Sequence, residues 1–178
     1  MGANMARTFT PLQPPDTHHL SAAEGWLGLG SVVDAHDELK QISLEARFHP
    51  NVLRVRWEVY ARGGHWEFAH TIAQGLIAFL PDDVAGYINR SLALHQLKRT
   101  PEAWHNLLPA ALKFPDNSTI ALHLARYACQ LGHLDEAKAW IKKAVTLDDA
   151  GELMSRALKE PDLAPLWPYY GKLSAALK

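Results

Sequence analysis

The chain has 178 residues, of which 48% are apolar and 21% are charged, and its formal net charge is −1. This composition is typical of one folded domain or one elongated repeat array, and it excludes a disordered chain. The balanced charge argues against a dedicated nucleic-acid binder, and a single cysteine, Cys129, excludes an internal disulfide. No apolar run is long enough for a membrane span, and the N-terminus lacks the apolar core of a secretory signal, so we expect a cytoplasmic protein.

The first segment, residues 1–17, is predicted to be an extended arm. Pro11, Pro14 and Pro15 lie close together in it, and proline lacks the backbone N–H group that a helix interior requires. Three prolines are too few for a repetitive polyproline segment, so the sequence assigns no specific role to this arm.

The main feature of the sequence is a repeat with a period of 34 residues. Four stretches align without gaps, and they begin at Leu29, Gly63, Leu97 and Leu131. An alanine recurs at the same phase in each of them, as Ala35, Ala69, Ala103 and Ala137. Five residues earlier stand Gly30, Gly64, Lys98 and Gly132. The period is too short for armadillo or HEAT units and too long for leucine-rich repeats.

Within each period the apolar residues predict two helices. In the second copy Leu53, Trp57 and Tyr60 follow helical spacing, a glycine pair then breaks the chain, and a second apolar stripe ends before Pro81. Trp26 and Trp57 occupy the packing phase of the repeat and are expected in the core. The recurrent alanine is expected where two helices cross closely, since only a small side chain lets the backbones approach. No Asn-Gly hairpin signal occurs, so we expect an all-α chain.

This pattern resembles the tetratricopeptide repeat (TPR), which has a large-small-large pattern on its first helix, glycine at the turn, alanine on the second helix and proline at its end. The resemblance covers roughly residues 20–149. It implies a right-handed α-solenoid of about four TPR-like helix pairs followed by C-terminal capping helices. The four repeats are expected at about 18–49, 50–83, 84–117 and 118–149.

Two departures from the family pattern stand out. The proline that closes the first unit, Pro50, comes three residues late, which indicates either a longer second helix or an irregular exit loop. Arg56 and Arg90 stand where the family commonly has leucine.

Residues 150–178 are predicted to form a C-terminal cap. The sequence GELMSRALK predicts a ninth helix, and the prolines that follow, Pro161, Pro165 and Pro168, forbid a continuous helix. Leu163 and Leu166 are too apolar for a solvated tail, so we expect this run to fold back over the exposed end of the last repeat, as a solenoid requires. The sequence PDLAPLW also resembles the tail that follows such repeats in a set of bacterial proteins, which implies a bacterial origin.

No residue pattern points to catalysis or to a bound cofactor. The run GWLGLG has the wrong order for a dinucleotide-binding fingerprint, and no phosphate loop, G-x-S-x-G or H-E-x-x-H motif occurs. Of the ten histidines, only His95 and His123 are expected to project from first helices near Cys129, which is too few ligands for zinc. We therefore expect neither an enzyme nor a cofactor nor a metal site.

The TPR resemblance implies that the first helices line a concave face where a partner binds. The residues at its ligand-facing positions mix apolar, hydrogen-bonding and charged side chains, which suits an extended peptide or a helix laid in a groove. These residues are Arg54, Glu58, Arg62, Ile88, Asn89, Leu92, His95, Gln96, Leu122, His123 and Arg126.

The positively charged residues of this predicted groove are not equally available to a ligand. Glu58 is one helical turn from both Arg54 and Arg62, so it is expected to neutralise them in part. Arg126, with the two histidines of the set, is then the cation most available to a ligand. A branch of the family grips a C-terminal carboxylate, and Arg54 and Asn89 match two of its positions, but Glu58 would repel a carboxylate. We therefore do not predict that clamp.

Three functions remain open at this stage. The first is a non-enzymatic protein-interaction module or scaffold that binds a peptide or helix of another protein. The second is a structural unit that self-assembles into a homo-oligomer. The third, RNA reading by helical repeats, is disfavoured because the charge is neutral and the groove residues do not recur in phase.

Overall fold

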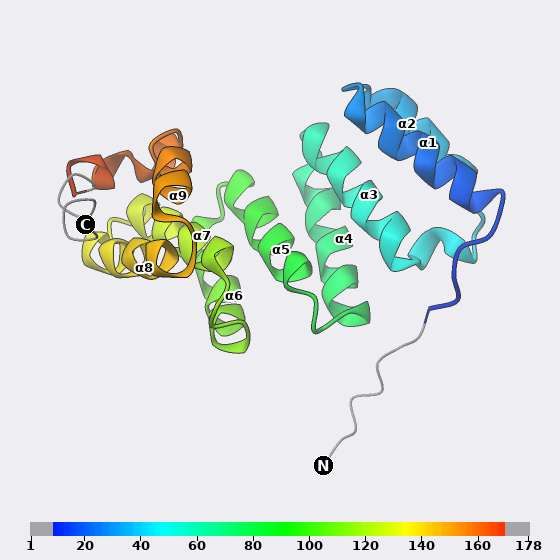
Figure 1. The fold of residues 1–178 in the computed structure, drawn as a ribbon. Helices are drawn as coiled ribbons and strands as arrows, with labels where there is room; N and C mark the ends of the chain where they lie inside the picture. Colours follow the sequence, from blue (N-terminus) through cyan, green and yellow to red (C-terminus); the bar gives the residue numbers. More distant parts are fainter. Residues whose placement is uncertain (1–8, 170–178) are drawn as a thin grey trace, which may run out of the picture. The chain divides into compact units, whose positions relative to one another are not determined.

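The computed structural model describes residues 9–169, and every regular element within that range is helical (Figure 1). The prediction of an all-α chain is thereby confirmed. The chain divides between Ala93 and Leu94 into two compact units, which we call unit 1 and unit 2. No helix of the described part is long and apolar enough to cross a membrane.

Unit 1 consists of two complete helix pairs and most of a fifth helix. Its elements are α1 (Asp16–Gly28), α2 (Val32–Gln41), the short 3-10 helix η1 (Ala46–Phe48), α3 (Pro50–Arg62), α4 (Trp66–Phe79) and the greater part of α5 (Val84–Gln96). Figure 1 shows α1 beside α2 and α3 beside α4, and these pairs make extensive contact. The core at α1, α2 and α3 is built from leucine, isoleucine, valine and alanine side chains, with Leu27, Ala35 and Val52 almost fully buried.

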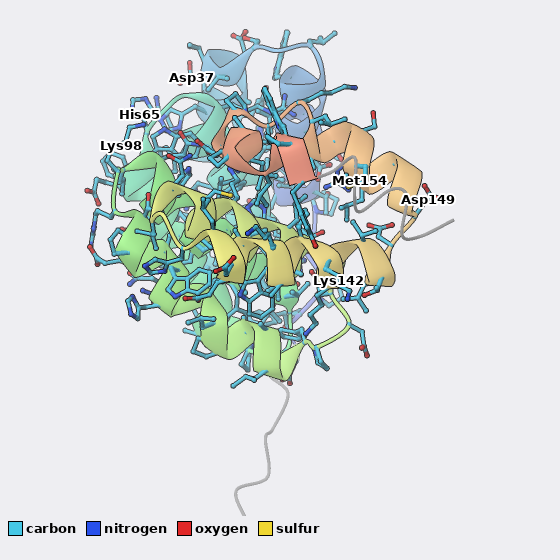
Figure 2. All side chains as sticks on the ribbon, turned by 90° about the vertical axis from the view of Figure 1, so that its left-hand side faces the viewer. Asp37, His65, Lys98, Lys142, Asp149 and Met154 are labelled. Atoms are coloured by element: carbon cyan, nitrogen blue, oxygen red, sulfur yellow. The ribbon has the colours of Figure 1, made fainter. Side chains whose placement is uncertain are left out.

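Unit 2 begins at the end of α5 and contains the remaining helices. They are α6 (Thr100–Lys113), α7 (Ser118–Gln130), α8 (Leu134–Leu147), α9 (Ala150–Ala157) and the 3-10 helix η2 (Pro161–Leu166). The largest contact within unit 2 joins α7 to α8. Asp149, labelled in Figure 2, caps α9 because its side chain accepts a hydrogen bond of 2.8 Å from the backbone N–H of Glu152.

The interhelical turns lie where the repeat predicts them. Gly30, Gly64 and Gly132 have φ angles of 82°, 73° and 78°, a left-handed conformation that glycine adopts without steric cost. Lys98 stands at the same phase between α5 and α6 and adopts a φ of 63°. A lysine there shows that the turn geometry persists where the glycine of the pattern is missing.

The recurrent alanines lie at close helix contacts, as expected. Ala35, Ala69, Ala103 and Ala137 are all 0% exposed. Their burial at the same position of four consecutive repeats agrees with the alignment from which the repeat was identified.

Replacement of Ala137 by leucine is expected to lower the free energy of unfolding by about 1–3 kcal/mol, because the added atoms overpack a filled contact. Ala139 lies on the same helix, is exposed and serves as a matched control, since Ala139→Leu adds the same atoms in water. Urea denaturation monitored by circular dichroism measures both changes. Equal stability of the two variants would contradict the assigned repeat phase.

The first repeat differs from expectation in two respects. Its second helix, α2, has 10 residues whereas α4 has 14, so the alternative of a longer helix is wrong and the irregular exit loop containing η1 is the correct one. Pro50 starts α3 rather than closing α2, which suits proline because the first helical residue needs no N–H partner. Trp26 is 38% exposed, contrary to the expected core position. The main contacts of α1 with other described helices are those with α2 and α3.

The prediction that the chain folds back after α9 is confirmed. The segment η2 contacts α7 and α8, and its Leu163 and Leu166 are 0% and 1% exposed. Residues 1–8 of the predicted arm and 170–178 of the predicted cap lie outside the described residues.

Candidate functional site

The predicted groove residues of unit 1 lie on α3 and α5, and the arginines among them already have carboxylate partners. Arg54 donates to Asp83 Oδ2 at 2.6 Å. Arg62 donates to Glu58 Oε1 at 2.5 Å and to the backbone oxygen of Leu27 at 2.6 Å. The expected neutralisation by Glu58 therefore holds for Arg62, while Arg54 turns to the loop before α5.

The α5 members of the set offer a different chemistry. Ile88, Asn89 and Leu92 are partly exposed, so this helix presents two apolar side chains and one amide. Leu122 of α7 is only 7% exposed and takes part in packing. Gln96 is partly exposed, and His123 is partly exposed as a residue while its ring atom Nδ1 is buried.

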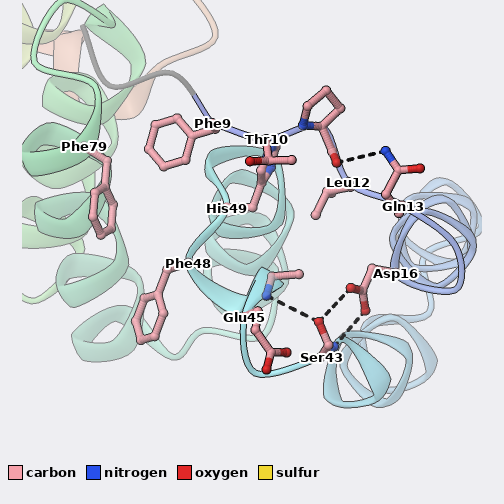
Figure 3. Close-up of a pocket in the computed structure, with 12 residues that line it drawn as sticks. Phe9, Thr10, Leu12, Gln13, Asp16, Ser43, Glu45, Phe48, His49 and Phe79 are labelled. Atoms are coloured by element: carbon pink, nitrogen blue, oxygen red, sulfur yellow. Dashed lines mark hydrogen bonds between the residues drawn. The ribbon is translucent and has the colours of Figure 1, made fainter. Parts of the chain in front are cut away.

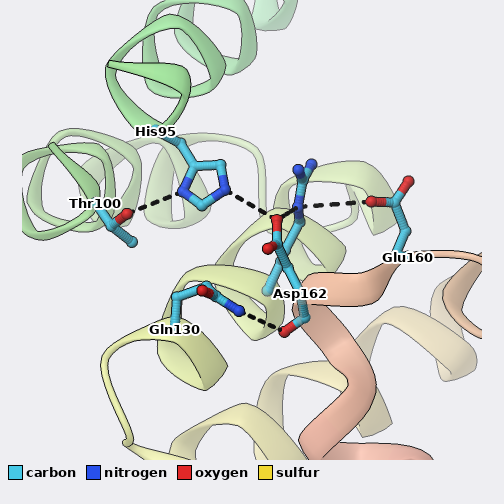
Figure 4. A network of polar contacts seen from close by, with 6 residues as sticks. His95, Thr100, Gln130, Glu160 and Asp162 are labelled. Atoms are coloured by element: carbon cyan, nitrogen blue, oxygen red, sulfur yellow. Dashed lines mark hydrogen bonds and ion pairs between the residues drawn. The ribbon is translucent and has the colours of Figure 1, made fainter. Parts of the chain in front are cut away.

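Arg126 is not an available cation, and that expectation is wrong. Its Nε donates to Asp162 Oδ2 at 2.8 Å and lies 3.6 Å from Glu160 Oε2 (Figure 4). Asp162 Oδ2 is also 2.9 Å from Nε2 of His95. The carboxylate of the capping segment thus occupies the position where an acidic group of a partner was expected.

The contact between the cap and α7 is extended by further hydrogen bonds. Gln130 donates from Nε2 to the backbone oxygen of Asp162 at 3.1 Å, and His95 Nδ1 is 3.0 Å from Thr100 Oγ1 (Figure 4). Burial alone would raise the pKa of Asp162, but the hydrogen bonds from His95 and Arg126 outweigh it and keep that pKa below its ordinary value. The carboxylate is therefore ionised and firmly held at neutral pH.

Sequence reasoning missed Asp162. It lies 67 residues from His95 and 36 from Arg126, so no local pattern links them. The available signal was an acidic residue set between a proline and two leucines in a tail that must fold back.

Neither metal chemistry nor thiol chemistry is assembled in the described part of the chain. No group of three or more His, Cys, Asp or Glu side chains there is arranged to hold a metal ion. Burial raises the pKa of the Cys129 thiol to about 11. The group is therefore protonated at neutral pH and is a poor nucleophile.

Unit 1 also contains a cavity of about 500 Å³ beside the N-terminal arm (Figure 3). Its aromatic wall includes Phe9, whose ring lies 6.0 Å from that of Phe79 and 5.8 Å from that of His49, both edge-on. Asp16 accepts hydrogen bonds of 2.7 Å from the backbone and the hydroxyl of Ser43. This ties the start of α1 to the loop after α2 and so fixes the opposite side of the cavity.

Comparisons with known proteins give the fold. No family model and no characterised protein sequence matches the chain, whereas solved structures of MamA do. MamA residues 41 to the end from Desulfovibrio magneticus RS-1 has a TM-score of 0.69 at 17% identity, over 93% of this chain and 98% of that chain. MamA MSR-1 has a TM-score of 0.64 at 21% identity, over 75% and 76% of the two chains. MamA AMB-1 has a TM-score of 0.63 at 19% identity, over 90% of this chain and 92% of that chain. These likenesses confirm the fold class, an α-solenoid of TPR-like helix pairs.

Proposed function

We propose that the protein is a non-enzymatic interaction module that holds a peptide or a helix of a partner protein against the first helices of its repeats. The observation that carries this proposal is the seating of the chain's own segment, Pro161–Leu166, on α7. That segment uses one carboxylate, Asp162, and two buried leucines. A first helix of this protein therefore has the chemistry to hold a short proline-flanked segment.

The face of α7 is already occupied, so we assign partner binding to the first helices of unit 1. Ile88 and Leu92 supply apolar side chains there and Asn89 supplies an amide. The arginines of α3 have carboxylate partners, so apolar contact with hydrogen bonding is expected to dominate over ion pairing.

Introducing Leu92→Asp is expected to weaken capture of a partner at least about tenfold, which corresponds to about 1.4 kcal/mol. A charged group in place of a contacting apolar one leaves an unpaired charge at the interface. A photo-reactive residue at position 92 reports the partner directly, with one at the 85% exposed Leu112 on α6 as the control. Adducts at 112 and none at 92 would contradict the assignment to the first helices.

The alternative, self-assembly into a homo-oligomer, is favoured by apolar side chains that unit 1 exposes to solvent. Five of them are more than 60% exposed: Leu29, Val33, Leu44, Phe48 and Phe68. Exposed apolar clusters commonly mark contact surfaces. Sedimentation at several protein concentrations separates this alternative from a monomeric binding module.

A further inference from the structure

A groove on unit 1, formed mainly between α2 and α3, joins an apolar end to a cationic end. The apolar end is a cavity of about 420 Å³, and the cationic end is a smaller one of about 230 Å³. Both are lined by His36, Lys40 and Tyr60, so the two cavities are adjacent. We call the pair the α2–α3 groove. Phe68 of α4 completes the apolar end and Arg47 of η1 completes the cationic end.

The apolar end is a cluster of aromatic rings that is open to solvent. The rings of Tyr60 and Phe68 stack with centroids 5.2 Å apart, and His65 meets both edge-on at 6.3 and 6.5 Å. Phe68 is nevertheless 61% exposed, and Val33 across the groove is 71% exposed. The three rings pack against one another, while Val33 and Phe68 stay exposed to solvent. This arrangement can accommodate one large apolar side chain of a ligand.

The cationic end is formed by two arginines whose hydrogen bonds to other described residues go to backbone oxygens. Arg47 donates to the backbone oxygens of Ile42 and Lys40, at 3.2 and 3.3 Å. Arg56 donates to the backbone oxygen of Arg47, at 3.4 Å. Within residues 9–169 no carboxylate oxygen lies within ion-pair distance of either guanidinium, in contrast to Arg54, Arg62 and Arg126.

The charges around these arginines do not cancel. The acidic residue of the groove, Asp37, pairs with Lys40 at 2.7 Å, so these two neutralise each other. Burial lowers the pKa of Arg56; Tyr60 opposes this with a smaller effect, and the neighbouring Arg47 adds the smallest contribution, which lowers the pKa again. Burial and then Lys40 likewise lower the pKa of His36. Each group disfavours added positive charge, and a bound anion would relieve that cost.

The spacing of the two ends fits a short stretch of extended chain. Val32 lines the apolar end and Lys40 lines both ends, and this stretch of α2 rises about 12 Å at about 1.5 Å per residue. An extended peptide covers that length in about four residues. A guanidinium can bind a carboxylate by two parallel hydrogen bonds, which makes a carboxylate the expected ligand of the cationic end.

We propose that the α2–α3 groove binds an acidic segment of a partner protein. It seats one large apolar side chain between Val33 and Phe68 and a carboxylate, about four residues away, on Arg47 and Arg56. The site uses other residues than the α5 surface of Ile88, Asn89 and Leu92 and gives the module a second, charge-selective contact. The replacement of the common leucine by Arg56 was its only sequence signal.

The test is selection from an immobilised array of short peptides of random sequence. The wild-type chain is expected to retain peptides in which glutamate or aspartate stands about four residues from tryptophan, phenylalanine or leucine. The double variant Arg47→Gln, Arg56→Gln is expected to bind the selected peptide at least about tenfold more weakly, a loss typical of charge-assisted hydrogen bonds. The double variant Arg47→Lys, Arg56→Lys keeps the charge and is expected to retain part of the affinity.

Arg56 is partly buried, so its replacement could affect folding as well as binding. A second variant, at an exposed position, separates these two effects. Val33 lies at the apolar end, on the exposed surface of α2. In the variant Val33→Glu the new carboxylate repels acidic peptides, so we expect binding to be abolished while the circular dichroism spectrum stays unchanged. Lys138→Gln on α8 removes a surface cation elsewhere and is expected to leave binding unchanged. Leu92→Asp is expected to leave it unchanged as well, which separates this site from the α5 surface.

Three outcomes would overturn the proposal. The first is that the wild-type chain selects no acidic peptides, and the second is that the glutamine double variant binds the selected peptides equally well. A dimer that sediments as such and dissociates in the glutamine double variant would assign the groove to a second copy of this chain instead.

Discussion

Replacement of Leu163 by alanine is expected to lower the free energy of unfolding by about 2–5 kcal/mol. This side chain is 0% exposed in η2, where the capping segment lies against α7 and α8. The substitution removes the buried methyl groups of Leu163 and leaves a cavity. The short segment between two prolines has little freedom to move and fill that cavity. Urea denaturation of the full chain, followed by circular dichroism, measures the change.

Leu158 provides the matched control for this prediction. It lies just after α9 and is 50% exposed, so Leu158→Ala is expected to change stability by less than about 1 kcal/mol. If Leu163→Ala is as stable as Leu158→Ala, the capping segment contributes nothing to unit 2, and its burial of the α7 face would have to be abandoned.

Lowering the pH from about 6.5 to about 4 is expected to destabilise unit 2 through His123. Burial, and then the nearby Arg126 and His95, lower the pKa of His123 from 6.5 to about 4. The unfolded chain therefore binds this proton more tightly than the folded one. The contribution of neutral His123 is complete above pH 6.5 and is lost as the pH falls toward 4, a total of about 3 kcal/mol.

The variant His123→Phe separates this effect from the other titrating groups. It keeps a ring beside Tyr127, whose centroid lies 5.9 Å from that of His123, and removes the proton-binding site. Its stability is expected to fall less between pH 6.5 and 4 than that of the unaltered chain. Asp162 has little effect on this comparison. Its pKa is lowered in the folded chain, so the stability contributed by its ionised form is lost mainly below about pH 4.

The capping segment links stability to function in this protein. The ion pairs of Asp162 with Arg126 and His95 fill the face of α7 that the repeat pattern predicts for a ligand. By contrast, the hydrogen bonds that Arg47 and Arg56 make to other described residues go to backbone oxygens. The cations that we propose for an acidic partner therefore lie on η1 and α3 of unit 1, outside the set of residues predicted from the repeat.

The sequence by itself determined the helical architecture, because that information is local. The period, the turn glycines and the recurrent alanines depend on steric rules that act within one or two helices. They located the turns at Gly30, Gly64, Lys98 and Gly132 and the close contact at Ala137, as the structure has them. The late position of Pro50 left two alternatives, a longer second helix or an irregular exit loop. Local pattern did not decide between them, because proline is suited both to the region after one helix and to the first residue of the next.

Only the tertiary structure decided which charges are available to a partner. Whether an arginine is free depends on which carboxylate lies within about 4 Å of it, and such partners stand far away in sequence, as Asp162 does for Arg126. The same holds for Arg56, whose place in the repeat is visible in the sequence but whose hydrogen bond to the backbone oxygen of Arg47 is not. Helix phase follows from short-range sterics, whereas charge pairing follows from how distant segments fold onto one another.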